Sequence, residues 1–486
     1  MAGGGTRHKE GGSMKDRLKE KALFESSPVW QAVLKLAFPT VIGQIILVVY
    51  NIADTFFIGL TGSDAMVTCV TVCMPAFMFL SAISNLFGIG GASVISRALG
   101  SQDRDRAQNT AAFAFWGCLA VSLLYSLGTL LCLNPFIDML GGSAPAVHPM
   151  ARQYLLVTVV LGGVCTAMST FLSHLVRSEG RSVHASFGIT LGGLVNIALD
   201  PLFIFVLLPK GMEVLGAAIA TALANVISLL YFAAILRSRN TRSVLNVRFS
   251  RLMFQNGIPA DVIGCGLPAC LMTLCENISY AVLDNLMALN GVSFQAGLGV
   301  AKKVNMLAHC IVRGMAQGVL PLISYNYASG NHRRMKEAVL LSTSVSVILA
   351  GACTAASLTV GRQLVNLFLQ SASQSVDFGA QFLRILCIGG PFSACAYAII
   401  SFFQAVGCGM KSFVLAILRK GLLDIPLMFA LRRVSPMFGI VWATPIADIL
   451  CCVASVGLFV VFIYGKPHRA ENKMLTLSQR GVLYHD

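Results

Sequence analysis

Twelve long apolar segments constrain the fold of this chain more than any other feature. An α-helix needs about 20 apolar residues to cross the roughly 30 Å hydrocarbon core of a bilayer. A chain of 486 residues that is 56% hydrophobic and only 12% charged carries more apolar surface than one soluble globule can bury. We therefore predict an all-α integral membrane protein with twelve transmembrane helices, near residues 32–60, 66–96, 107–133, 152–176, 183–208, 213–236, 261–289, 294–326, 337–360, 378–404, 411–431 and 438–464.

Lysine and arginine gather in alternate loops, and this asymmetry predicts the orientation, because basic residues are retained on the cytoplasmic side. They occur in "KDRLKEK", "SRALGSQDRDRAQ", "RSEGR", "RSRNTRSVLNVRFSR", "GNHRRMKEA" and "GKPHR". We expect a multi-pass protein of the cytoplasmic membrane with both termini in the cytoplasm. The net charge of +15 then reflects topology and contact with anionic lipids, and we expect no nucleic-acid partner.

The two halves of the chain repeat each other. The stretch "GAAIATALANVIS" at 216–228 returns as "GIVWATPIADILC" at 439–451. Pro39 in "AFPTVIGQ" returns at nearly the same separation as Pro268 in "GLPACLMT". Each half holds six predicted helices, an even number, so both halves cross the membrane in the same direction. They are then two six-helix bundles related by a pseudo-twofold axis along the membrane normal, and the cleft between them is typical of a transporter.

This repeat sets the predicted domain boundaries. We expect a disordered cytoplasmic segment over 1–29, an N-lobe over 30–240, a cytoplasmic linker over 241–256, a C-lobe over 257–465 and a cytoplasmic tail over 466–486. The fifteen cysteines show no metal-binding or disulfide spacing. We expect a monomer without a cofactor other than a coupling ion.

Two carboxylates fall inside predicted N-lobe helices, where a charge costs about 2.5 to 3.5 kcal/mol even on insertion scales. Asn196 and Asp200 are four residues apart and share one helix face, and Pro201 interrupts the backbone hydrogen bonding beside them. Asp54 and Thr221 lie at a matching depth on neighbouring helices, by the rise of about 1.5 Å per residue.

A lone buried Asn or Thr usually hydrogen-bonds a neighbouring helix. Two carboxylates at one depth instead need a cation or a proton between them. The sequence therefore predicts an ion-coupling site made by Asp54, Asn196, Asp200 and Thr221. Its oxygen ligands suit Na⁺, and repulsion between the two acids suits a proton. Both remain open from the sequence.

The chain resembles the multidrug and toxic compound extrusion (MATE) family over essentially all of residues 30–465, through "YNIADTFFIG", "ASVISRALGSQDRDRA", "RSEGR", "NIALDPLFIF", "GAAIATALANVIS" and "GMAQGVLPLISYNYASGNHRR". The resemblance implies a two-lobed, twelve-helix antiporter. Such a protein exports organic cations and other amphiphilic small molecules in exchange for Na⁺ or H⁺ by alternating access. In the branch of the family with an N-lobe ion site, the family's ion-site residues match Asp54, Asn196, Asp200 and Thr221.

The C-terminal half departs from the pattern of another branch of the family, which uses acids in the C-lobe. Glu276 matches the acid expected on helix 7, but Tyr397 stands near the position of the acid on helix 10. Asp284, Asp424 and Thr444 lie near the repeat equivalents of Asp54, Asp200 and Thr221.

This C-lobe set is either a second ion or substrate site or a group of structural ion pairs. We favour the structural interpretation, with Asp424 facing Arg419 or Lys420. The residues expected to line the cleft are Lys302, Lys303, Arg313 and Gln317.

Two alternatives remain open from the sequence. A flippase for a lipid-linked or amphiphilic metabolite shares the two-bundle architecture, and Lys302 and Lys303 are compatible with pyrophosphate binding. A membrane-embedded enzyme would need a nucleophile with its base or a set of metal ligands, and the sequence contains no such motif.

Overall fold

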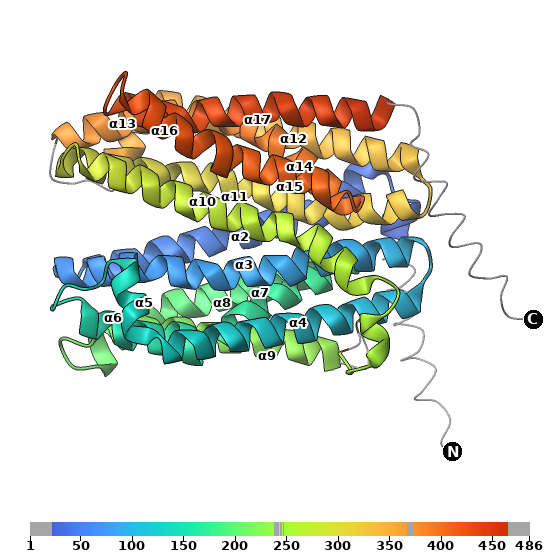
Figure 1. Cartoon of the computed structure of the whole chain (residues 1–486), viewed down its shortest axis with the longest axis horizontal. Helices are drawn as coiled ribbons and strands as arrows, with labels where there is room; N and C mark the ends of the chain where they lie inside the picture. The colour runs from blue at the N-terminus through green and yellow to red at the C-terminus, as the bar shows by residue number, and fades with distance from the viewer. Residues whose placement is uncertain (1–21, 238–242, 244, 246, 367–372, 465–486) are drawn as a thin grey trace, which may run out of the picture.

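The computed structural model describes residues 22–237, 243, 245, 247–366 and 373–464. Most of the predicted segment 1–29 and all of the predicted tail lie outside the described residues. Within them, every regular element is helical, and the order of the elements is that of two successive bundles. Figure 1 shows the first bundle in blue to green and the second in yellow to red, side by side along their length.

The first bundle, here called the N-lobe, contains α2 (Val29–Gly59), α3 (Asp64–Gly100), α4 (Arg104–Leu131), α5 (Leu133–Leu140), α6 (His148–Leu155), η1 (Leu156–Leu161), α7 (Gly163–Ser178), α8 (Ser182–Leu202), η2 (Phe203–Leu207) and α9 (Glu213–Arg237). A short helix, η3 (Arg251–Phe254), precedes the second bundle. This bundle, the C-lobe, contains α10 (Ile258–Ala288), α11 (Val292–Ala328), α12 (His332–Asn366), α13 (Ser373–Ile388), α14 (Gly390–Ala405), α15 (Gly409–Ile417), η4 (Leu418–Asp424), α16 (Ile425–Arg432) and α17 (Phe438–Tyr464).

The number of helices that cross the membrane follows from length and composition. Among the described residues, nine helices are long and apolar enough to span a bilayer, and two bent pairs raise that number to eleven. The remaining predicted segment is the continuous helical run of α15, η4 and α16. Its interior holds Arg419, Lys420 and Asp424, all buried, which explains why composition alone does not mark it as a span.

The bends fall at equivalent places in the two lobes. In the N-lobe, the helix of residues 148–161 meets that of 163–178 at 48°, and in the C-lobe the helix of residues 374–388 meets that of 390–405 at 41°. A glycine separates the two parts in each case, Gly162 and Gly389. The internal repeat of the sequence is therefore visible in the shape of single helices.

The contacts between the lobes have the same twofold symmetry as the sequence repeat. The most extensive pairing in the molecule joins α3 to α10, and the next joins α2 to α11. Since α10 and α11 are the repeat equivalents of α2 and α3, these two pairings exchange with each other under a twofold rotation. The axis between the lobes thus passes between α3 and α11, which also pack together.

The lobes approach most closely at one end of the molecule, here called the terminal end, where α2 and α10 begin and α3, α11 and α17 end (Figure 1). A Cβ atom on Gly266 of α10 would lie 1.7 Å from the Leu86 carbonyl oxygen of α3. A Cβ atom on Gly318 of α11 would lie 2.6 Å from Cα of Ala37 on α2. Glycine therefore allows backbone to pack against backbone at both equivalent pairings.

Candidate ion site and central cavity

The N-lobe acid site is built on one face of α8 and on α9. The amide nitrogen of Asn196 donates to Oδ1 of Asp200 at 3.1 Å and to Oγ1 of Thr221 at 3.3 Å. All three side chains are buried, and Asp200 has no exposed surface. The structure thus brings together three of the four residues that the sequence predicts for this site.

Asp54, the fourth residue, reaches the site from α2, which packs along α8. Its side chain lies within electrostatic range of Asp200, and no ion pair joins either carboxylate to a basic residue within the described chain. Three buried oxygen atoms here have no hydrogen-bond partner: Oδ1 of Asp54, Oδ1 of Asn196 and Oδ2 of Asp200.

Unpartnered buried acceptors are costly, so this arrangement fits a positively charged guest or a proton. No group of three or more His, Cys, Asp or Glu residues that could hold a metal ion occurs among the described residues. The donor set of two carboxylates, an amide oxygen and a hydroxyl suits a hard monovalent cation.

The helix that carries Asn196 and Asp200 is irregular directly after them. α8 continues through Pro201 and then widens into the π-helix η2 over Phe203–Leu207. Proline lacks the amide hydrogen that would close the regular ladder, and π-helical turns recur at functional sites. The local sequence therefore places an irregular stretch of backbone beside the buried acid.

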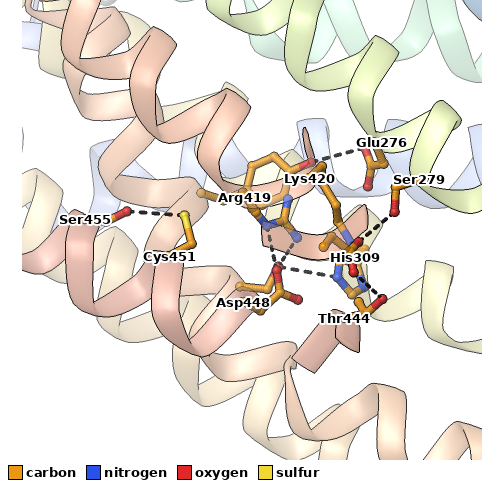
Figure 2. Close-up of polar contacts among 12 residues, drawn as sticks. Glu276, Ser279, His309, Arg419, Lys420, Thr444, Asp448, Cys451 and Ser455 are labelled. Atoms are coloured by element: carbon orange, nitrogen blue, oxygen red, sulfur yellow. Dashed lines mark hydrogen bonds and ion pairs between the residues drawn. The ribbon is translucent and has the colours of Figure 1, made fainter. Parts of the chain in front are cut away.

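The C-lobe holds a second buried acid, Asp424, but with its partners supplied by the protein. Lys420 donates to its Oδ2 at 2.8 Å, Ser279 donates to the same oxygen at 2.7 Å, and Thr444 donates to Oδ1 at 3.0 Å. Figure 2 shows the side chains of Lys420, Ser279 and Thr444 converging from three elements. Both oxygens of this carboxylate are satisfied.

A second ion pair lies beside it in the C-lobe interior. Nε of Arg419 donates to Oδ1 of Asp448 at 2.7 Å, and both side chains are almost completely buried (Figure 2). Arg419 also donates to Oγ of Ser393 at 2.6 Å and lies 4.5 Å from the ring centre of Tyr397. A cation held by a carboxylate, a hydroxyl and an aromatic face is well compensated.

Asp284, the third C-lobe acid of the sequence analysis, pairs with Lys302. Lys302 and Lys303 do not belong to the lining of the central cavity described below. The sequence leaves two possible partners for Asp424, Arg419 and Lys420. Lys420 forms the ion pair with Asp424, and Arg419 pairs with Asp448.

A cavity with an empty volume of about 470 Å³ lies where the lobes meet, between α3, α10, α11 and α14. Glu276 and Arg313 both line it, and Nη2 of Arg313 lies 2.8 Å from Oε2 of Glu276. The buried side chain of Gln404 also lines it, with its amide nitrogen unpartnered. The polar lining comprises Asn85, Thr273, Glu276, Arg313, Gln317, Tyr397, Ser401 and Gln404.

Comparison with known protein families shows which family this chain belongs to. The pattern of the MatE family matches residues 39–202 and again residues 268–430, which together cover more than half of the chain. The chain belongs to this family. Two matches, one per lobe, also confirm the internal repeat. MATE proteins are ion-coupled transporters, so the predicted antiporter fold and function are confirmed and the enzyme alternative is not supported.

Individual relatives agree with this assignment. The chain is 28% identical over 439 residues to the multidrug export protein MepA of Staphylococcus aureus, covering 89% of this chain and 94% of that protein. A crystal structure of a MATE in complex with MaL6 is 25% identical and superposes with a TM-score of 0.80, over 89% of this chain and 96% of the other. An outward-facing multidrug resistance MATE transporter of the MOP superfamily, 24% identical with a TM-score of 0.80 over 89% of this chain and 95% of the other, shows the same fold.

Three residues around the buried ion pairs of the C-lobe are not among those that the sequence predicts for a site. Asp448, Ser279 and Ser393 complete the ion pairs described above. Asp448 carries a usable signal, because it is a charge four residues after Thr444 in an apolar helix. The two serines carry none, since a single hydroxyl in an apolar helix is common and usually bonds its own backbone.

Proposed function

We propose that this MATE transporter exports amphiphilic organic cations and couples each export step to the entry of one Na⁺ ion or proton at Asp54 and Asp200. The observation that carries the proposal is the pair of N-lobe carboxylates with no basic partner among the described residues and with one buried oxygen of each unsatisfied. An ion that binds there interacts differently with the two lobe arrangements and so can bias them. Asn196 and Thr221 hold the Asp200 side chain in place.

The substrate in this proposal occupies the central cavity between the lobes. Multidrug export is the activity named for the Staphylococcus aureus relative. The lining of the cavity combines Met272, Ile89 and Leu320 with the ion pair of Glu276 and Arg313. A lining that mixes apolar and polar side chains in this way suits an amphiphile. Arg313 is already paired, so the described residues that line the cavity include no free cation for a pyrophosphate, which argues against the flippase alternative.

The proposal includes an orientation in the membrane. The terminal end carries the basic loops, so it faces the cytoplasm by the retention of positive charge. In the described structure the lobes are packed together at this end, and the cavity lies at the level of the glycine contacts, where Ile89 and Leu320 line it close to Leu86 and Gly318. Transport then requires that the lobes separate at the terminal end and close at the other.

The test uses purified protein in liposomes with a fluorescent organic cation. A sodium gradient at fixed pH and a pH gradient without sodium are applied separately, and export that follows one of them identifies the ion. Asp200→Asn should lose gradient-driven export while it still binds the substrate. The matched control is Asp138→Asn, which removes a half-exposed carboxylate elsewhere in the N-lobe and should transport normally. Gradient-driven export by Asp200→Asn at the wild-type rate would refute the proposal.

A further inference from the structure

The C-lobe contains a copy of the N-lobe ion site. Asp424 repeats Asp200 and Thr444 repeats Thr221, at almost the same separation along the chain. A proline and a π-helical stretch accompany each acid: Asp200 precedes Pro201 and η2, and Asp424 ends η4 two residues before Pro426. Each threonine hydroxyl is hydrogen-bonded within its own site, that of Thr444 directly to Asp424.

One position differs in a way that changes the charge. Asn196 stands four residues before Asp200, and Lys420 stands four residues before Asp424. In the N-lobe the amide of Asn196 leaves Oδ2 of Asp200 without a partner. In the C-lobe the ammonium of Lys420 lies 2.8 Å from Oδ2 of Asp424, with both side chains at most 2% exposed. The carboxylate oxygen Oδ2 therefore has no partner in the N-lobe, whereas its equivalent in the C-lobe is paired with an ammonium group.

The second acid of each site shows the same difference. Asp54 stands four residues after Tyr50, and Asp284 stands four residues after Tyr280. Asp54 has no basic partner among the described residues, whereas Asp284 pairs with Lys302. The Tyr280 ring centre lies 5.2 Å from the ammonium nitrogen of Lys302 and 5.6 Å from that of Lys420. Both C-lobe ammonium groups therefore lie around one aromatic ring.

We infer that Lys420 is a tethered cation that fills the C-lobe copy of the ion site, so that removing its side chain opens a binding site for a free monovalent cation. Asp424, Ser279 and Thr444 would then provide the oxygen ligands. It follows that the natural protein takes up its coupling ion in the N-lobe alone. The inference rests on the proposed N-lobe ion site only as the template for this geometry.

The experiment measures binding of radioactive sodium, and separately of radioactive methylammonium, to purified full-length protein at equilibrium. Methylammonium has the charge and head group of the missing lysine. The background is Asp200→Asn, in which the N-lobe acid is removed. In this background Lys420→Asn should raise cation binding from none to one cation per chain. The triple variant that adds Asp424→Asn should bind none.

A second readout covers the case in which Lys420→Asn is unstable. An uncompensated buried Asp424 lowers stability, and a free cation should restore it, so sodium or methylammonium should raise the melting temperature of Lys420→Asn and choline should not. No gain in binding and no rescue by either cation, including failure to fold in every cation, would overturn the inference. The proposed function fails separately, if wild type shows no coupling ion while Asp200→Asn/Lys420→Asn still binds one cation.

Discussion

Arg313 and Glu276 face each other across α11 and α10 in the central cavity, with 2.8 Å between Nη2 and Oε2. The carboxylate also accepts a longer hydrogen bond of 3.4 Å from the Tyr397 hydroxyl. Among the described residues that line the cavity, these two carry the only formal charges. The net formal charge of the cavity lining is therefore zero. Neutralising Glu276 leaves it positive, and neutralising Arg313 leaves it negative.

The first prediction concerns substrate charge. Glu276→Gln leaves Arg313 uncompensated, so binding of a lipophilic organic cation should weaken about tenfold, or about 1.4 kcal/mol, because like charges repel. Arg313→Gln should strengthen binding of the same cation. The measurement is equilibrium binding of a fluorescent cation and of its neutral analogue to purified protein. The double variant is neutral again and should recover most of the wild-type affinity. Equal losses for the cation and the neutral analogue would show that the pair only shapes the cavity.

The second prediction concerns closure at the terminal end. Gly266→Ala places a methyl group 1.7 Å from the Leu86 carbonyl oxygen, so α3 and α10 must separate. Cys265 is buried there at 2% exposure, against Arg97 of the other lobe. Its rate of alkylation in detergent should rise several-fold, while that of Cys118 in the N-lobe core should not change.

The control for this closure test is Gly264→Ala on the same helix, where an added Cβ meets nothing within 4 Å. This variant should keep Cys265 protected. If the two alanine variants alkylate alike, the glycine contact does not hold the lobes together.

The third prediction concerns stability. Asp448→Asn leaves the fully buried Arg419 without its carboxylate, and breaking a buried pair from one side costs about 3 to 5 kcal/mol. The melting temperature of the purified protein should fall clearly. Glu337→Gln removes an exposed partner of Arg333 and should cost well under about 1 kcal/mol. A similar small effect at Asp448 would mean that Ser393 and the Tyr397 ring compensate Arg419 without it.

Much of the fold is predictable because membrane spans are long and uniform in composition. The twelve predicted segments correspond to the eleven spans and the charged run of α15, η4 and α16. The bends beside Gly162 and Gly389 are not part of the prediction, although each glycine is followed by a second one, Gly163 or Gly390, and such pairs are common places for a kink. Sequence periodicity carries no record of such a bend.

The candidate site is also predictable only in part. The spacing on one helix pairs Asn196 with Asp200, and depth adds Thr221, because both follow from helix geometry. The sequence predicts Lys302 in the cleft, which stays a prediction, and it does not predict the ion pair of Lys302 with Asp284. Which way a long side chain points depends on the rotation of its helix about its own axis, and that rotation is set by packing rather than by local sequence.

The last prediction tests the orientation of the chain with a natural reporter. Cys132 ends α4 at the end of the bundle opposite the terminal end, and it is the one exposed cysteine of the fifteen. If the terminal end is cytoplasmic, a membrane-impermeant maleimide should label Cys132 in intact cells. Cys132→Ser should abolish this label. In that background Ser101→Cys, placed in the exposed turn after α3 at the terminal end, should react only after permeabilisation. Labelling of Ser101→Cys in intact cells together with protection of Cys132 would reverse the orientation and move the closed end of the described structure to the outside.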